Sequence, residues 1–291
     1  MPSLIAATSL RVDRAGVPDV DGLSFASGGS WVLVLGAGRA LFEAAAGLRP
    51  AQRGELRIDG AAPAEALSLG FVASAPLDPP MPPAWLPRQY VTWSARVSGH
   101  PRRVANDLAS DALDRLELAA SAQIRLSKAP LAMRRATVLA AALATGATTL
   151  LIENPLVDLP PAGRRPFARV VARALTDRRV VVFGGRLPFE SPLVFAADEA
   201  IVIDGSQVAA QGAPAEIVAR ERAFVLRVTG DVPAFARLVE ARGGRLLAPP
   251  GGTPAVLSIE LGGFGTGQLF AMAVTAGAVV LELRPIAGAF A

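Results

Sequence analysis

The sequence predicts an α/β protein with a mostly parallel core sheet, followed by a small α+β domain. Over residues 1–220, short apolar runs alternate with helical segments, a rhythm typical of parallel strands joined by helices. Residues 221–291 instead alternate as strand, helix, strand, strand, helix, strand, which is the split βαβ pattern of a ferredoxin-like domain. We therefore expect one domain over 1–220, with a helical subdomain at about 75–145, and a second domain over 221–291.

Each element follows from a local pattern. Strands are expected where apolar residues run for a few positions between turn signals, at 4–12, 20–27, 31–35, 54–59, 69–73, 148–155 and 178–185, with a hairpin at 199–212. Helices are expected at 39–48, 86–98, 101–117, 131–144 and 161–175. The prolines between 77 and 87 exclude a regular element there. The apolar stretch 136–152 is too short and too rich in Ala and Thr for a membrane span, so it predicts a buried helix followed by a buried strand.

Composition excludes several classes of site. The chain has no cysteine, so disulfides, thiolate metal sites and thiolate nucleophiles are impossible. Its single histidine, His100, lies in a segment expected to be a solvated loop, and no metal site is predicted. The net charge is +4, but the arginines are scattered, so no nucleic-acid partner is expected. No basic leader followed by a cleavage pattern opens the chain, so no signal peptide is predicted.

Residues 31–60 have the layout of a phosphate-binding loop without its chemistry. An apolar strand at 31–35 leads into Gly36-Ala37-Gly38, a short helix and a second strand. The full motif, G-x-x-x-x-G-K-[ST], needs glycine N–H groups, a lysine for the β/γ-phosphates and a hydroxyl for Mg²⁺. Here the loop is too short, the lysine is missing, and Ala40 or Leu41 stands at the hydroxyl position.

Four segments, in order, resemble the ATP-binding subunit of an ABC transporter, of the type that has a small C-terminal domain and serves ABC-2 exporters. The segments are GLSFASGGSWVLVLG, AGLRPAQRGELRIDG, MRRATVLAAAL before TLLIENPL, and ADEAIVIDGSQVAAQGAPAEI. The resemblance covers nearly the whole chain. The resemblance implies a P-loop NTPase-like cassette with a mostly parallel core sheet, an antiparallel β subdomain and a helical subdomain, and it implies ATP and Mg²⁺ as the family's ligands.

The resemblance places the nucleotide positions of that family on unusual residues. The adenine-stacking position falls at Arg14 and the position that couples nucleotide to permease falls at Ser74. The phosphate loop falls on Gly36, Ala37, Gly38, Arg39 and Ala40. Arg39 could offer charge, but arginine and lysine are not interchangeable in a tight phosphate cradle.

The remaining family positions are also altered. The signature loop, L-S-G-G-x, falls on a region that includes Leu126, Ser127, Lys128 and Ala132 and contains no S-G-G. In the Walker B strand, Glu153 occupies the position of the family's Mg²⁺-linked Asp, and Asn154 occupies the position of its catalytic Glu. Asparagine cannot accept a proton from water, so the general base is lost. The switch histidine is replaced by Gly185.

These losses predict a catalytically inactive cassette with no bound cofactor, although weak nucleotide binding by the glycine loop stays open. The resemblance then implies an ABC-2-type permease as partner, a heterodimer with an intact ATPase or a homodimer, and a place at the cytoplasmic face of the membrane. Trp85, Tyr90 and Trp93 are candidate interface residues, because aromatic side chains are enriched in interface hot spots. Trp85, flanked by prolines, is the preferred candidate, since Tyr90 and Trp93 could equally pack inside the helical subdomain.

Two alternatives stay open. One is a working ATP-binding subunit in which Arg39 replaces the lysine and Glu153 replaces both Walker B acids. The other is a freestanding interaction module on the same fold, because a fold does not fix a function.

Overall fold

The computed structural model describes residues 3–14, 17–36, 39–121, 123–220, 223–247 and 256–285. Contacts between Cα atoms divide the chain into two compact units, Met1–Pro214 and Ala215–Ala291. The division lies after the first residue of helix α8 (Pro214–Arg220), and the domain boundary at 220 stays a prediction. The two units are described separately.

A six-stranded sheet forms the centre of the first unit. Its strands lie in the order β5-β6-β7-β3-β8-β9, and every neighbouring pair is parallel except β8–β9. The strands are β3 (Trp31–Leu35), β5 (Val72–Ala75), β6 (Thr149–Glu153), β7 (Arg179–Gly184), β8 (Glu199–Asp204) and β9 (Gln207–Gly212). Every residue of β3 and β6 is buried, as expected of parallel strands that are covered on both faces. The mostly parallel sheet predicted from the sequence is confirmed.

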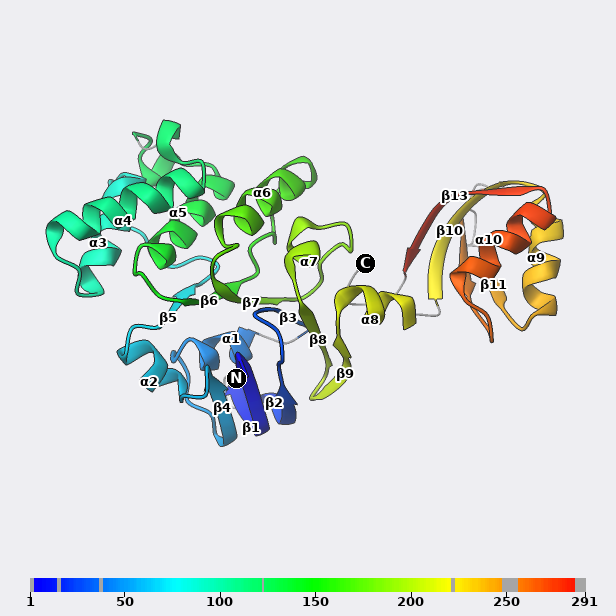
Figure 1. Ribbon diagram of the computed structural model, residues 1–291, viewed down its shortest axis with the longest axis horizontal. Helices are drawn as coiled ribbons and strands as arrows, with labels where there is room; N and C mark the ends of the chain where they lie inside the picture. The colour runs from blue at the N-terminus through cyan, green and yellow to red at the C-terminus, as the bar shows by residue number, and fades with distance from the viewer. Residues whose placement is uncertain are drawn as a thin grey trace. The chain divides into compact units, whose positions relative to one another are not determined.

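One face of this sheet is covered by a second, antiparallel sheet and a short helix (Figure 1). The second sheet has the order β2-β1-β4, from β1 (Ile5–Arg14), β2 (Val17–Ala26) and β4 (Arg53–Ile58). Helix α1 (Arg39–Ala45) contacts β1, β2, β4 and β6. Phe42 of α1 and Phe183 of β7 meet edge to face, with ring centroids 5.6 Å apart. The segment after β3 is therefore part of the main core.

Helices cover the other face (Figure 1). They are α3 (Pro87–Val97), α4 (Arg102–Arg115), α5 (Leu131–Leu143) and α6 (Pro161–Ala174), close to the predicted bounds. All four begin after a proline at the N-cap or with a proline in the first turn, where the missing N–H has no intrahelical partner to lose. Ten of the 13 residues of α5 are buried, so the apolar stretch 136–152 is the buried helix and strand that were predicted.

The structure corrects several predicted elements. The strand expected at 69–73 is β5, which begins only at Val72, because α2 (Pro63–Ser68) precedes it and Gly70 takes φ +75°. Helix α1 ends at Ala45 rather than 48, since Gly47 takes φ +67°. Helices α2, α7 (Pro192–Ala196) and α8 were not predicted. Each has seven residues or fewer and begins with a proline, and a short segment of this kind is equally typical of a loop.

The second unit has the expected order of elements. It consists of β10 (Ala223–Gly230), α9 (Val232–Ala241), β11 (Arg245–Leu247), β12 (Val256–Glu260), α10 (Thr266–Thr275) and β13 (Ala278–Pro285). The sheet is antiparallel with the order β11-β12-β10-β13. The first and last strands of the βαββαβ unit, β10 and β13, are therefore neighbours in the sheet. Phe235 of α9 and Leu269 of α10 are fully buried against this sheet.

Candidate functional site

The candidate site lies where α1 begins beside the ends of β3, β6 and β7. It holds Arg39 and Ala40 of the predicted phosphate loop, Glu153 at the end of β6, and Asn154 and Gly185, which follow β6 and β7. Ala37 and Gly38 lie outside the described residues. The topology therefore gathers the predicted loop, Walker B and switch positions at one edge of the sheet.

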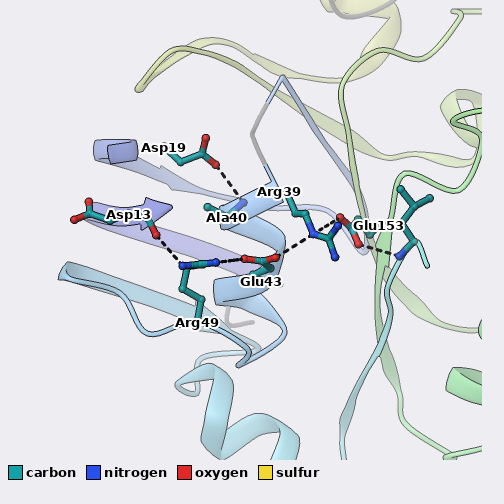
Figure 2. Close-up of polar contacts among 8 residues, drawn as sticks. Asp13, Asp19, Arg39, Ala40, Glu43, Arg49 and Glu153 are labelled. Carbon is teal, nitrogen blue, oxygen red and sulfur yellow. Dashed lines mark hydrogen bonds and ion pairs between the residues drawn. The ribbon is translucent and has the colours of Figure 1, made fainter. Parts of the chain in front are cut away.

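Arg39 is held by two of the chain's own carboxylates (Figure 2). Its Nε lies 3.0 Å from Glu43 Oε1, one turn along α1, and 3.4 Å from Glu153 Oε1. The side chain of Glu153 is 2% exposed, and its Oε2 accepts a hydrogen bond of 2.9 Å from the N–H of Leu77. Both oxygens of the buried carboxylate are thus engaged, and the positive charge of Arg39 is opposed by two negative charges.

A second guanidinium extends this network. Arg49 Nη2 lies 2.7 Å from Glu43 Oε2, and Arg49 Nη1 donates to the carbonyl of Asp13 at 3.1 Å. Burial raises the pKa of Glu43, but the hydrogen bond and charge of Arg49, together with Arg39, outweigh that effect and hold the pKa below its ordinary value of 4.5. Glu43 is therefore ionised at neutral pH and bridges the two arginines.

The N–H of Ala40, in the first turn of α1, also has a partner within the protein. Asp19 Oδ2 of β2 accepts a hydrogen bond of 3.2 Å from the N–H of Ala40 (Figure 2). In a phosphate loop such N–H groups face the phosphates. Among the five charged side chains of this network, three carboxylates stand against two guanidinium groups, so its net charge is negative.

The positions of the missing base and switch residue are joined to each other. Asn154 Oδ1 accepts the N–H of Gly185 at 3.2 Å, and the N–H of Asn154 donates to the carbonyl of Phe183 at 2.7 Å. The N–H of Gly36 donates to the carbonyls of Gly184 and Gly185, at 2.9 and 3.1 Å. The ends of β3, β6 and β7 are thus tied together by the protein's own polar groups.

Replacing Glu43 with glutamine is expected to weaken the acid dependence of stability. Because the pKa of Glu43 is lowered on folding, its contribution is complete above about pH 4.5 and is lost as the pH falls through the folded value. The Glu43→Gln variant should unfold at lower urea than the natural chain at pH 7 and should approach it near pH 3. Glu65→Gln, at an exposed position on α2, serves as the control and should follow the natural chain at every pH. An unchanged pH profile for Glu43→Gln would show that the two arginines do not bind it in solution.

Comparison with solved structures identifies the architecture. The chain is similar to cbiO1 from Clostridium perfringens, described as part of the ABC transporter complex cbiONQ, with a TM-score of 0.63 and 15% identity over 76% of this chain and 92% of that one. It is also similar to MJ1267 in its ADP conformation, described as an ATP-binding cassette of an ABC transporter, with a TM-score of 0.60 and 13% identity over 73% of this chain and 92% of that one. The chain has the ABC cassette fold. No protein-family model matches the sequence, and no curated protein matches it.

The signature region of this cassette fold contains no glycine loop. Leu126, Ser127 and Lys128 form a 3₁₀ turn, and Ala132 is the second residue of α5. The N–H groups of Leu126 and Ser127 donate to carbonyls of the proline-rich loop, those of Trp85 and Pro83, at 2.8 and 3.0 Å. The backbone donors of this turn are therefore used within the cassette.

A polar cavity of about 370 Å³ lies beside this turn. Ser127, Arg134, Arg135, Asp78 and Asp158 are among the residues that line it. Burial lowers the pKa of Arg135, although the carboxylates of Asp78 and Asp158 oppose the effect. Arg135 also donates to the carbonyls of Pro155 and Val157, which anchors the loop after β6 to α5.

Ser74, the predicted permease-coupling position, lies on β5 and lines a groove between β5, α3 and α5. This groove, called the α3 groove below, has a volume of about 760 Å³ and is also lined by Leu69, Tyr90, Val97 and His100. His100 was expected to be solvated, but it is half-buried, and its Nε2 lies 2.7 Å from the carbonyl oxygen of Thr145. Thr145 is 45 residues from His100 in the sequence, so the local sequence does not indicate this contact.

The three candidate aromatic residues form one cluster. The ring centroids of Trp85 and Trp93 are 6.0 Å apart, and those of Tyr90 and Trp93 are 6.1 Å apart. The preferred candidate was Trp85, yet Trp93 is the exposed member at 49%, while Trp85 and Tyr90 are half-buried. Burial raises the pKa of Tyr90. Trp85 belongs to the proline-rich loop, and its ring packs against Trp93 of α3.

Arg14, the predicted adenine-side residue, lies at the exposed end of β1. None of the hydrogen bonds described above joins it to the Arg39 network. The sequence pattern missed Asp19, Glu43 and Arg49. Glu43 could have been found, because it lies four residues after Arg39 on a predicted helix. Asp19 could not, since it reaches Ala40 only through the packing of β2 on α1.

The described ranges contain neither a metal-binding cluster nor a membrane-spanning helix. No three His, Cys, Asp or Glu side chains in them gather as a metal ion would require. None of their helices is long and apolar enough to cross a membrane.

Proposed function

We propose that this chain is a non-catalytic, ATP-binding-cassette-like subunit of an ABC-2-type membrane transporter. It holds or regulates a permease at the cytoplasmic face of the membrane and pairs with an intact ATPase. The observation that carries the proposal is the engagement of Arg39 by Glu43 and Glu153, because Arg39 is the residue that would have to replace the missing lysine. The likeness of the fold to cbiO1, described as part of a transporter complex, supports the choice of partner.

The residues at this site do not fit Mg²⁺-ATP. The donor set lacks the lysine and the hydroxyl, and the N–H of Ala40 already meets a carboxylate. A nucleotide phosphate would approach a network with a negative net charge, which opposes a polyanion. Asn154, at the position of the base, donates and accepts within the protein and has no carboxylate with which to take a proton. We therefore derive no step of ATP hydrolysis for this chain.

Purified natural chain is expected to give no heat of binding with Mg²⁺-ATP at millimolar nucleotide in calorimetry. MJ1267, which has the same fold and is described as an ATP-binding cassette, serves as the positive control. Micromolar binding by the natural chain would reject the proposal and favour an ATP-binding subunit with an atypical loop. Arg39→Gln and Glu153→Gln would then show whether these two residues hold the nucleotide.

The scaffold role has its own test. A tagged chain co-expressed with an ABC-2-type permease from the same genome is expected to copurify with that permease in detergent. Leu69→Arg, which places a charge at a 65% exposed position of the α3 groove, should abolish copurification. Leu48→Arg is the matched control, since Leu48 is 68% exposed and does not line the groove. If the Leu69→Arg variant still copurifies, the groove is excluded as the docking site. If the natural chain does not copurify with the permease, a freestanding interaction module is favoured.

A further inference from the structure

One stretch of the helical subdomain carries only positive charge. Between Asp78 and Asp107 the sequence contains no acidic residue, but it contains four arginines, Arg88, Arg96, Arg102 and Arg103. All four are exposed, on α3 or at the start of α4. Within the described part of the chain, none of them forms an ion pair with a carboxylate. Their charge is therefore available to an anionic partner.

Exposed apolar and aromatic side chains accompany these arginines. On α3, Trp93 is 49% exposed and Val97 is 68% exposed, and Arg96 lies between them in sequence. Residues three and four apart share a helix face, so Trp93, Arg96 and Val97 form one stripe. On α4, Val104 is 42% exposed next to Arg103. We call the exposed residues Trp93, Arg96, Val97, Arg102, Arg103 and Val104 the α3–α4 surface.

The ring of Trp93 is held in place while it stays exposed. It meets the half-buried ring of Trp85 edge to face and that of Tyr90 at a tilt, and the carbonyl of Trp85 accepts the N–H of Leu126. Exposing a large apolar ring to water is costly. An exposed ring that is held in place beside several cations is typical of a binding surface. Helices α3 and α4 lie against each other, which places the two halves of the surface on one subdomain (Figure 1).

We propose that the α3–α4 surface binds anionic phospholipid headgroups at a membrane surface. Tryptophan and arginine are enriched at the level of the headgroups, where the ring enters the interface and the guanidinium meets phosphate. The valines favour lipid over nucleic acid, because exposed aliphatic side chains gain nothing from a phosphate backbone but are removed from water among lipids. The surface meets the α3 groove at Val97, which also lines the groove, but lipid binding does not depend on a permease or on nucleotide.

Vesicle sedimentation with the full chain tests the proposal. The chain is expected to sediment with vesicles made of equal parts of phosphatidylcholine and phosphatidylglycerol, not with phosphatidylcholine alone, and less so in high salt. The double variant Arg96→Gln/Arg103→Gln should lower the association constant by about 30-fold, from the effect of two arginines near an anionic surface. Trp93→Ser should lower it several-fold, with the far-ultraviolet circular dichroism unchanged.

The matched control removes the same charge elsewhere. Arg165 and Arg169 are exposed on α6, and Arg165→Gln/Arg169→Gln should bind vesicles like the natural chain. Equal losses in the two double variants would overturn the proposal, because they would reflect net charge alone. Failure of the natural chain to bind the anionic vesicles, or equal binding to both vesicle types, would also overturn it. Binding to polyglutamate without binding to the anionic vesicles would assign the surface to an acidic protein segment instead.

Discussion

Replacing Gly36 with alanine is expected to destabilise the first unit by roughly 3–5 kcal/mol, from a strained backbone together with overpacking. Gly36 takes φ +80°, a conformation that costs an L-residue energy. A Cβ at this position would also overlap the carbonyl oxygen of Ile203, which belongs to β8 and cannot move without breaking the sheet. Urea unfolding followed by tryptophan fluorescence measures the change. All three tryptophans lie in the first unit, so the signal reports on that unit alone.

Gly70 provides the matched control for this variant. It takes φ +75°, but a Cβ there would meet no atom within 4 Å. Gly70→Ala should therefore cost only about 1–2 kcal/mol, the conformational part of the effect. Equal losses in the two variants would mean that the close approach of Ile203 to Gly36 is absent in solution.

Replacing Phe42 with alanine is expected to cost about 3–5 kcal/mol, the usual range for a buried phenylalanine. Phe42 is 1% exposed and contacts Phe183 across the space between α1 and β7. The truncation would leave a cavity that the two surrounding sheets cannot close, because their strands are fixed by backbone hydrogen bonds. The same fluorescence-monitored unfolding measures it.

Phe195→Ala is the control for Phe42→Ala. Phe195 lies on α7 in the same unit and is 69% exposed, so its loss should cost less than about 1 kcal/mol. A small effect of Phe42→Ala, within the range of this control, would show that α1 is not needed for the core. The scaffold proposal would then lose its structural basis, because α1 would not be needed for stability and could have been lost together with the ATPase activity.

The sequence was a good guide to the elements that are long or fully buried. The central strands β3 and β6 are continuous apolar runs, and α5 is an apolar helix bounded by Pro130, so composition alone marked them. Short elements were missed. Helix α2 has six residues, and the stop imposed by Gly70 moved the next strand by three positions.

The candidate site was predictable in place but not in its contacts. The order of strand, glycine turn and helix placed Arg39 at the start of a helix, and the resemblance placed Glu153 at the end of a buried strand. The fold brings both to one sheet edge, because the carboxyl ends of parallel strands meet there. Their ion pair depends on the packing of α1 against β6, and the hydrogen bond from Ala40 to Asp19 depends on β2. Such contacts join residues far apart in the chain, and no local pattern encodes them.

The bridging of Glu43 between Arg39 and Arg49 has an evolutionary consequence. If a mutation returned a lysine to the loop, that lysine would compete with two arginines for carboxylates that are already paired. It would still find Asn154 bonded to Gly185 and Asp19 bonded to Ala40. We expect no single reversion to restore activity, since each restored group would meet a neighbour adapted to its absence. If the chain is the non-catalytic subunit proposed above, loss of the chemistry would be difficult to reverse, and selection would keep the fold for its surfaces.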